Sequence, residues 1–325
     1  MDPLNRNLLA TAAPSGASVA DVFSSNIWTG DSSNREIVSG LDNSANEGVV
    51  WVKSTQYQIG HAMATTAQGA NSKIEPNSPQ AFQSDNQAIT RFDPVGYTLG
   101  NSNQVNYSGY EYVGWNFKSD PGFFDLVTWT GNGANGTPIP HNLGTTPGMI
   151  VIKNTSTGTF DWMMYHQNVG YSQIRRWNQF ESWVANTSFG GLTDAPDSSG
   201  FRITSGDYTN GPGNSYMAMV FGNDGERIKC DYYTGNGGTQ TIDVGFRPQF
   251  IIITNFTRAE DVIMVSDKVM DGSTPWYLFP GKPNAAYPVY NGVTGFTSNG
   301  FSLGSNLPTN QAGDTFCYMA IAAPQ

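Results

Sequence analysis

Three sequence landmarks recur in the same order about 100 residues apart, and this internal repetition constrains the fold more than any other feature. The first is an aromatic-Thr-Gly triplet, at 28–30, 129–131 and 233–235. The second is an apolar run, at 49–53, 149–153 and 250–254. The third is a Gly-aromatic strand opener, at 96–100, 200–204 and 300–304, which is followed by an apolar closing strand at 110–117, 216–221 and 316–322. A period this long exceeds the roughly 20 to 50 residues of a solenoid coil or propeller blade and matches a complete small domain.

The repetition also predicts where the chain divides. Asp, Gly and Pro interrupt the apolar pattern near 119–122 and 223–226. We therefore expect an N-terminal arm over residues 1–21 and three repeats over 22–119, 120–223 and 224–325. Each repeat should have its own core, and neighbouring repeats should touch because the linkers are short. The arm is made of small and polar residues and is expected to order only when it docks to a partner.

Within each repeat, runs of β-branched and aromatic residues are separated by Asn-Gly and Gly-Gly turn signals. This pattern predicts an all-β fold of three tandem antiparallel β-sandwiches, jelly-roll-like, of about 100 residues each. Helical periodicity occurs only at 171–184, where apolar residues at 174, 177, 180 and 184 suggest a short helix or an irregular loop.

The apolar runs at 149–152 and 250–253 lack the alternation expected of a strand with one face in solvent. Something should therefore cover their outer face. Either a long loop of the same repeat or another repeat or subunit can do so.

Composition limits the possible partners. Charged residues make up 13% of the chain, against about 25% in typical soluble proteins, so the surface must consist mainly of Asn, Ser, Thr, Gln and Gly. Such a surface suits a long-lived extracellular particle better than a cytosolic enzyme. The net charge of −10 and the lack of a basic run argue against nucleic acid as a partner. No stretch approaches the roughly 18 consecutive apolar residues of a membrane span, so no membrane insertion is expected.

The two cysteines, Cys230 and Cys317, match no metal or redox spacing. We expect them to be buried as small hydrophobic side chains. A disulfide is the alternative, because they fall on the first and last expected strands of one repeat.

Candidate catalytic groups are few. None of the three histidines, His61, His141 and His166, lies in a zinc or nucleophile motif. His141 lies in a Pro- and Gly-containing turn, and His166 could pair with Asp161, but no nucleophile signature accompanies that pair. A glycosidase needs only two carboxylates about 5 to 10 Å apart. Candidates for such a pair are Asp224, Glu226, Asp231, Glu260 and Asp261. We nevertheless expect no catalytic residue, no metal and no cofactor, because acids at linkers and turns are usually solvated and no calcium-loop pattern is present.

Aromatic side chains on loops can stack on the faces of sugars. The candidates for such a platform are Trp162, Trp177, Trp183 and Trp276. The alternative, which we favour, is that they fill hydrophobic cores.

Longer motifs of the second repeat carry a family resemblance. Residues 120–133 read Asp-Pro-Gly-Phe-Phe-Asp-Leu-Val-Thr-Trp-Thr-Gly-Asn-Gly, followed by Ile-Pro-His-Asn-Leu-Gly at 139–144 and Pro-Gly-Met-Ile-Val-Ile-Lys at 147–153. With 300–304 and 312–316, they resemble a repeated uncharacterised domain of tail-fibre-like virion structural proteins of marine and cyanobacterial bacteriophages. The resemblance covers roughly residues 22–322 and implies a β-rich structural or host-attachment role, usually without catalysis. The first repeat departs from the pattern, because Gly30-Asp31-Ser32 replaces Gly-Asn-Gly.

Together these features favour a non-enzymatic bacteriophage virion protein, assembled in the host cytoplasm, that acts as a tail fibre or appendage in host attachment or assembly. Two alternatives are a capsid-decorating or tail-hub architectural protein and a polysaccharide depolymerase. The expected partners are further copies of the chain, for example in a homotrimer, other virion proteins through the N-terminal arm, and a host-surface glycan. Binding would rely on loop Asn, Ser and Thr side chains and aromatic stacking, multiplied over several copies. The sequence assigns no particular binding residue.

Overall fold

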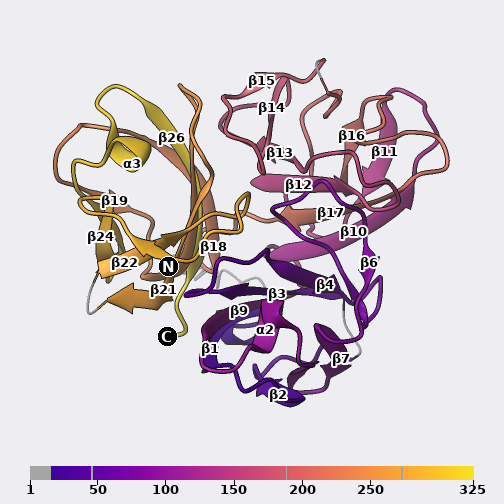
Figure 1. Ribbon diagram of the computed structural model, residues 1–325. Coiled ribbons are helices and arrows are strands. Elements are labelled where there is room, and N and C mark those ends of the chain that lie inside the picture. Colours follow the sequence, from indigo (N-terminus) through magenta and orange to yellow (C-terminus); the bar gives the residue numbers. More distant parts are fainter. Residues whose placement is uncertain (1–15, 45–46, 188, 272–273) are drawn as a thin grey trace, which may run out of the picture.

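Figure 1 shows the computed structural model, which describes residues 16–325 except 45–46, 188 and 272–273. Its sheets are antiparallel, and the helices within the described residues are short: α1 (Val19–Val22), α2 (Asn103–Asn106) and α3 (Leu307–Asn310). The predicted all-β fold with antiparallel sheets is confirmed. Among the described residues, no helix has the length and apolar character needed to cross a membrane.

One sheet arrangement recurs in three parts of the chain, which we call unit 1 (16–119), unit 2 (120–223) and unit 3 (224–325). In each unit the first strand pairs with the last, which pairs with the strand that contains the apolar run. Unit 1 has β1 (Phe23–Thr29), β9 (Glu111–Lys118), β3 (Gly48–Ser54) and β4 (Ala62–Thr65), in that order. Unit 2 has β10 (Phe124–Thr130), β17 (Ser215–Phe221), β12 (Met149–Asn154), β13 (Met163–His166), β14 (Gln173–Arg176) and β15 (Val184–Ala185). Unit 3 has β18 (Ile228–Thr234), β26 (Thr315–Ala322), β20 (Pro248–Asn255), β21 (Ile263–Asp271), β22 (Thr274–Leu278) and β23 (Tyr287–Pro288).

A smaller sheet accompanies each main sheet. In unit 1 it consists of β2 (Arg35–Val38), β8 (Gly96–Leu99) and β7 (Ile89–Asp93), with a separate pair β5 (Ser72–Lys73) and β6 (Gln83–Ser84). In unit 2 it consists of β11 (Thr137–Pro140) and β16 (Gly200–Ile203). In unit 3 it consists of β19 (Gln240–Asp243), β25 (Gly300–Leu303) and β24 (Val293–Thr297). Each unit therefore places a local hydrophobic core between a small outer sheet and a larger inner one.

The inner faces of the three main sheets meet in one shared core. Along β3, Val50 and Val52 point into the local core of unit 1, whereas Val49 and Trp51 point into the shared core. The strands β12 and β20 divide their side chains in the same way. The apolar runs lack alternation because both of their faces are buried, and of the two alternatives for the outer face the structure shows the second, a cover supplied by the other repeats.

The shared core changes how the repeats relate to one another. The expectation that each repeat would have its own core holds for the local clusters, but a larger cluster runs through all three units. The units surround this common centre and do not form a row of beads, as the indigo, pink and yellow parts of Figure 1 show. Part of the expected N-terminal arm also joins it, because Val19 of α1 is buried there together with Val22, the first residue of the expected first repeat. Residues 1–15 of the expected arm lie outside the described residues.

Polar contacts link the units in a closed cycle, from unit 1 to unit 2, from unit 2 to unit 3, and from unit 3 back to unit 1. They include Phe82 N–H to the Thr155 carbonyl (3.3 Å), the Arg175 guanidinium to the Glu260 carbonyl (2.8 Å), and Ala286 N–H to the Thr55 carbonyl (2.8 Å). Each unit therefore contacts both of the others.

The expected helix at 171–184 is absent. The segment contains β14 and β15, which pair through Gln173 with Ala185 and Ile174 with Val184. Ile174 enters the local core of unit 2, whereas Trp177 enters the shared core. Two of the apolar residues in helical spacing thus enter two cores on opposite sides of a sheet, whereas Phe180 is exposed. Of the two alternatives for this segment, the helix was wrong.

In every unit the aromatic residue of the aromatic-Thr-Gly triplet holds the turn that precedes the closing strand. The ring N–H of Trp28 donates to the Val105 carbonyl (3.0 Å), that of Trp129 to the Thr209 carbonyl (3.1 Å), and the Tyr233 hydroxyl to the Thr309 carbonyl (2.6 Å). The third residue of each triplet must be glycine, because the backbone of the facing turn lies close against it. A Cβ at Gly30, Gly131 or Gly235 would lie 2.2 Å from the backbone oxygen of the facing turn. These oxygens belong to Tyr107, Gly211 and Gln311.

Candidate functional site

Two of the three histidines link units in the interior. His61 is fully buried; its Nδ1 accepts from the Trp51 ring N–H (2.9 Å), so Nε2 carries the proton and donates to the carbonyl of Phe279 in unit 3 (2.9 Å). His166 is equally buried, and its Nε2 lies 3.0 Å from the carbonyl of Tyr318 in unit 3. Burial lowers the pKa of His166 to about 4 and that of His61 well below its ordinary value. Both rings are therefore neutral at pH 7, and their hydrogen bonds join units 1 and 2 to unit 3.

The expected pairing of His166 with Asp161 is not present. The Asp161 carboxylate accepts hydrogen bonds from Asn178 (2.7 Å), Gln179 (3.1 Å) and Arg176 (3.3 Å) instead. His141 lies in a loop after β11, as predicted, and its Nε2 is 3.1 Å from the Asp197 carbonyl. None of the three histidines is held ready for proton transfer to a ligand.

Buried cations occupy equivalent places after the apolar runs. The Lys53 ammonium donates to the carbonyls of Ser54 (2.9 Å), Tyr57 (3.4 Å) and Ile59 (3.0 Å). The Lys153 ammonium contacts two carbonyls of its own unit and that of Pro79 in unit 1 (2.9 Å). Burial lowers the pKa of each lysine to about 7. These amino groups tie loops together and face no ligand.

The five acids considered for a glycosidase pair are not gathered in one groove; two of them lie together, because burial and the nearby charge of Asp261 raise the pKa of the Glu260 carboxyl. Asp224 binds Arg227 (2.7 Å), and Asp261 binds Lys282 (2.5 Å). Asp231 lies 4.0 Å from Lys229, and none of the five lines the grooves described below. Within the described part of the chain, no group of three or more His, Cys, Asp or Glu residues is placed to bind a metal ion.

The tryptophans considered for a sugar platform fill the interior. Trp162, Trp177 and Trp183 are buried in the shared core, and Trp276 packs partly buried against it. Trp177 is sandwiched between Trp51 (5.5 Å between ring centroids) and Trp162 (5.6 Å). The core interpretation is confirmed, and the exposed platform they were considered for does not exist.

Both cysteines are free and buried, Cys230 in the shared core and Cys317 on the neighbouring strand β26. Burial raises the pKa of the Cys317 thiol to about 12 and raises that of Cys230 as well. The prediction of buried, hydrophobic cysteines is confirmed, and the disulfide alternative was wrong.

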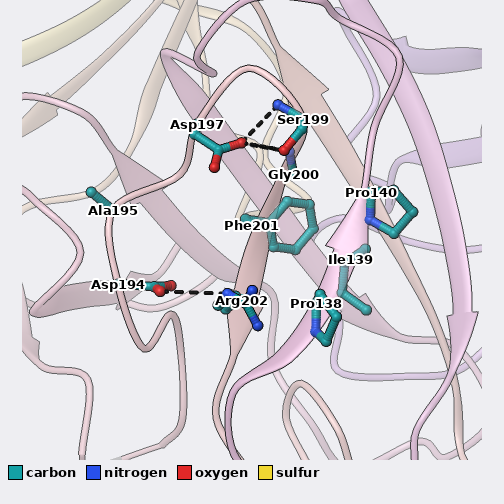
Figure 2. A pocket seen from close by; sticks show the side chains of 10 residues that line it. All are labelled: Pro138, Ile139, Pro140, Asp194, Ala195, Asp197, Ser199, Gly200, Phe201 and Arg202. Carbon is teal, nitrogen blue, oxygen red and sulfur yellow. Dashed lines mark hydrogen bonds and ion pairs between the residues drawn. The ribbon is translucent and has the colours of Figure 1, made fainter.

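A hollow of about 390 Å³ lies over the small sheet of unit 2, and Figure 2 shows the residues that line it. Its sheet side presents Pro138 and Pro140 of β11 and Gly200 and Arg202 of β16. The wall opposite is the loop over residues 194–199. Proteins commonly bind small ligands in hollows of roughly 300 Å³ and more.

An irregular loop creates this groove. In units 1 and 3 a third strand pairs along the small sheet, and ten residues separate Ile89 from its partner Leu99, as they separate Val293 from Leu303. In unit 2 the third strand is replaced by an isolated bridge from Leu192 to Ile203, eleven residues apart, and by hydrogen bonds from Thr193 N–H to the Arg202 carbonyl (2.9 Å) and from Asp197 N–H to the Gly200 carbonyl (3.0 Å). The loop is thus one residue longer than in units 1 and 3, and Pro196 has no N–H to donate to β16.

The groove of unit 2 is equipped for polar recognition. The Arg202 guanidinium lies 3.6 Å from the Asp194 carboxylate, with both side chains about half exposed. The Asp197 carboxylate accepts from the Ser199 hydroxyl (2.6 Å), and the Ser199 hydrogen bonds lower the pKa of this carboxyl (Figure 2). A general acid at pH 7 needs a raised pKa, so the groove fits binding better than acid catalysis.

A second groove, of about 230 Å³, lies between units 1 and 2 and is acidic. Glu47 and Asp125 line it together with Asp120, which is paired with Arg227 (2.6 Å). Partial burial and the nearby charge of Asp125 raise the pKa of the Glu47 carboxyl. The Asp125 carboxylate accepts from the backbone N–H of Asn142 (2.7 Å).

Sequence reasoning missed both grooves and a repeated buried asparagine. Asn106, Asn210 and Asn310 are fully buried, and the side-chain oxygen of each accepts the N–H of the residue after the triplet glycine, at 3.2, 3.0 and 2.9 Å. Each stands six residues before the aromatic residue on the closing strand, at 112, 216 and 316, so a repeat-by-repeat alignment could have found it.

The described residues thus define an all-β protein whose three units repeat one sheet arrangement around a shared core and differ at their outer surfaces. The chain belongs to the family described as a domain of unknown function, DUF7483, whose model matches residues 18–324. That match spans all three units. No curated protein and no solved structure matches the chain.

Proposed function

We propose that the chain is a bacteriophage virion structural protein, part of a tail fibre or appendage, that acts in host attachment or assembly and has no catalytic activity. The phage context comes from the motifs at 120–133, 139–144 and 147–153 and the resemblance they carry. One structural observation supports a binding role. The three units share the hydrogen bonds of the triplet and the buried asparagine, which we call the framework contacts, and they differ on their outer surfaces.

The framework contacts repeat closely. The triplet aromatic, its glycine and the buried asparagine make the same hydrogen bonds in every unit. The surface positions do not repeat: in unit 2 a loop with an isolated bridge and a groove beside it stands where units 1 and 3 have a paired third strand. A rigid scaffold that presents varied loops is the usual arrangement of a recognition protein.

The closed cycle of units also bears on the expected partners. The inner sheet faces of all three units are buried within one chain. Homo-oligomer contacts, such as those of a trimer, would therefore use the outer surfaces or the N-terminal arm. Residues 16 and 17 lead from the arm into the fold, and Arg227 holds this entry by donating to the Ala17 carbonyl (2.9 Å). We propose that the arm docks to other virion proteins.

A cryo-electron-microscopy map of a virion that encodes this chain tests the proposal. We expect density for the three units on an appendage, and the distal tip would mark a role in attachment. Density on the capsid shell or in the tail hub would make the protein architectural. The absence of the chain from purified virions would contradict the proposal.

The acidic groove supports one alternative, a polysaccharide depolymerase, because it holds the Glu47 carboxyl with a raised pKa near the Asp125 carboxylate. The test is release of reducing sugar from host envelope polysaccharide by the purified chain. Release that disappears in both Glu47→Gln and Asp125→Asn, and persists in Asp194→Asn of the unit 2 groove, would favour the enzyme.

A further inference from the structure

Three tyrosine rings form an exposed cluster at one edge of unit 1. The ring centroids of Tyr57 and Tyr110 lie 4.9 Å apart, and those of Tyr107 and Tyr110 lie 5.4 Å apart with nearly parallel planes. Tyr57 is 6.0 Å from Tyr107 and inclined to it by 35°. Tyr107 is 39% exposed, and the other two are partly exposed. We call Tyr57, Tyr107 and Tyr110 the tyrosine cluster.

The framework fixes the backbone beneath each ring. The Tyr57 N–H donates to the Ser54 hydroxyl (2.9 Å), and the Tyr107 N–H donates to the Tyr112 hydroxyl (2.9 Å). The Tyr110 N–H donates to the Tyr107 carbonyl (3.2 Å). Among the described residues, no hydrogen bond engages the three phenolic hydroxyls of the cluster itself. The cluster is thus a preformed aromatic surface with hydroxyls available to a ligand.

The same surface positions differ in the other units. Thr157 N–H donates to Asn154 Oδ1, and Arg258 N–H donates to Asn255 Oδ1, just as Tyr57 N–H donates to the Ser54 hydroxyl. Thr157 and Arg258 therefore occupy the position of Tyr57. The positions of Tyr107 and Tyr110 correspond to Gly211 and Asn214 in unit 2 and to Gln311 and Asp314 in unit 3. Unit 3 closes its site with an ion pair from Arg258 to Asp314 (2.6 Å). Only unit 1 fills it with aromatic rings, so the common framework does not explain them.

We propose that the tyrosine cluster is a binding site for neutral hexose units of a saccharide. Aromatic rings pack against the C–H faces of sugars, and phenolic hydroxyls donate to and accept from sugar hydroxyls. Beside the cluster, Gln56 and Glu111 bond each other (3.2 Å) and offer further polar atoms. The Glu111 carboxylate and the net charge of −10 disfavour uronic acids and sulfated sugars. This inference deepens the proposed role in attachment and rests on it for its biological meaning.

The experiment uses the full chain on an array of neutral oligosaccharides of glucose, mannose and galactose, with oligogalacturonates on the same array. Titration calorimetry then measures the affinity for the best neutral binder. We expect Tyr107→Ala and Tyr57→Ala to weaken that affinity by about tenfold or more. Tyr290→Ala is the matched control, because Tyr290 in unit 3 is 85% exposed and lies outside the cluster. It should leave the affinity unchanged.

Three results would overturn the site: no neutral oligosaccharide binds, oligogalacturonates bind more tightly, or Tyr107→Ala binds like the wild type. Tyr107→Phe keeps the ring and removes only the hydroxyl, so it should retain more affinity than Tyr107→Ala. A failure here leaves the virion role intact, because position in the virion decides that role. Absence from the virion would likewise leave sugar binding by the purified chain unaffected.

Discussion

The Arg175 guanidinium of unit 2 donates a hydrogen bond to the Thr254 hydroxyl of unit 3. Thr254 follows the apolar run of β20, the position at which units 1 and 2 have Lys53 and Lys153. Arg175 also reaches the Glu260 carbonyl (2.8 Å), which is in the loop that corresponds to the one held by Lys53. Unit 3 has a threonine where the other units have a lysine, and the neighbouring unit 2 supplies a cation at this place.

Because Arg175 acts where units 1 and 2 use a lysine, we expect a lysine at position 254 to compensate for the loss of Arg175. Arg175→Met should lower the free energy of unfolding by about 3 kcal/mol, because it leaves buried carbonyls without donors. Adding Thr254→Lys should recover a large part of that loss by restoring the arrangement of units 1 and 2. Denaturant unfolding measures both variants. Arg202→Met, at a half-exposed arginine of unit 2, is the control and should change stability by less than about 0.5 kcal/mol. Equal loss in the single and double variants would contradict this account.

The buried lysines predict that stability rises with pH above neutrality. Burial lowers the pKa of Lys53 and Lys153 to about 7 in the folded protein, whereas the ordinary lysine value is 10.5. Below pH 7 both states hold these protons, so the lysines add no pH dependence there. Between pH 7 and about 9.5 only the unfolded state keeps them, and stability should increase by up to about 1.4 kcal/mol per pH unit for each lysine.

Unfolding free energies at pH 6, 7, 8 and 9.5 measure this slope. The double variant Lys53→Met and Lys153→Met should show a clearly smaller slope over the same range. A wild-type profile as flat as that of the double variant would mean that the three carbonyl acceptors keep each ammonium charged.

The triplet glycines should resist even the smallest side chain. Gly131→Ala would place a Cβ 2.2 Å from the Gly211 carbonyl oxygen, and we expect a loss of roughly 3 kcal/mol in stability. Gly206→Ala is the matched control in the same unit, because its nearest neighbour would be 3.6 Å away. Thermal unfolding compares the two, and an equal effect would show that the turn yields without cost.

The cysteines should be unreactive until the protein unfolds. Both thiols are buried and their pKa values are raised, so little thiolate is present and reagents have no access to it. Ellman's reagent should detect no thiol in the native protein, and both after unfolding in guanidinium chloride without reductant. Rapid labelling of the native state would show that the core around Cys230 opens easily.

The fold class could be predicted because it depends on local pattern: β-branched runs and Asn-Gly turns indicate strands and hairpins wherever they occur. The shared core was only partly accessible. The unbroken apolar runs showed that both faces of β12 and β20 are covered, but sequence could not distinguish a loop from a neighbouring unit. At 171–184 the pattern misled, because Ile174 and Trp177 enter two different cores whose relative position the sequence does not contain.

The candidate sites were less predictable for a related reason. Tryptophan was considered for an exposed platform, although core filling was favoured, and its large apolar area draws Trp162 and Trp177 into the shared core. Tyrosine can pack its ring and still keep its hydroxyl in water, as the partly exposed tyrosines at 57, 107 and 110 do. Aligning the repeats position by position would have revealed it, since units 2 and 3 have no aromatic residue at those positions. The groove of unit 2 depends on one extra residue, whose effect on loop path no pattern predicts.

The covalent joining of the three units has a consequence for evolution. A ring of three identical subunits would disperse on dilution, and every substitution would appear in it three times. Within one chain the units meet at a high effective concentration set by their short linkers, so the ring forms at any protein concentration. Each outer surface is also encoded separately. One unit can acquire a new ligand while the other two keep their outer surfaces unchanged.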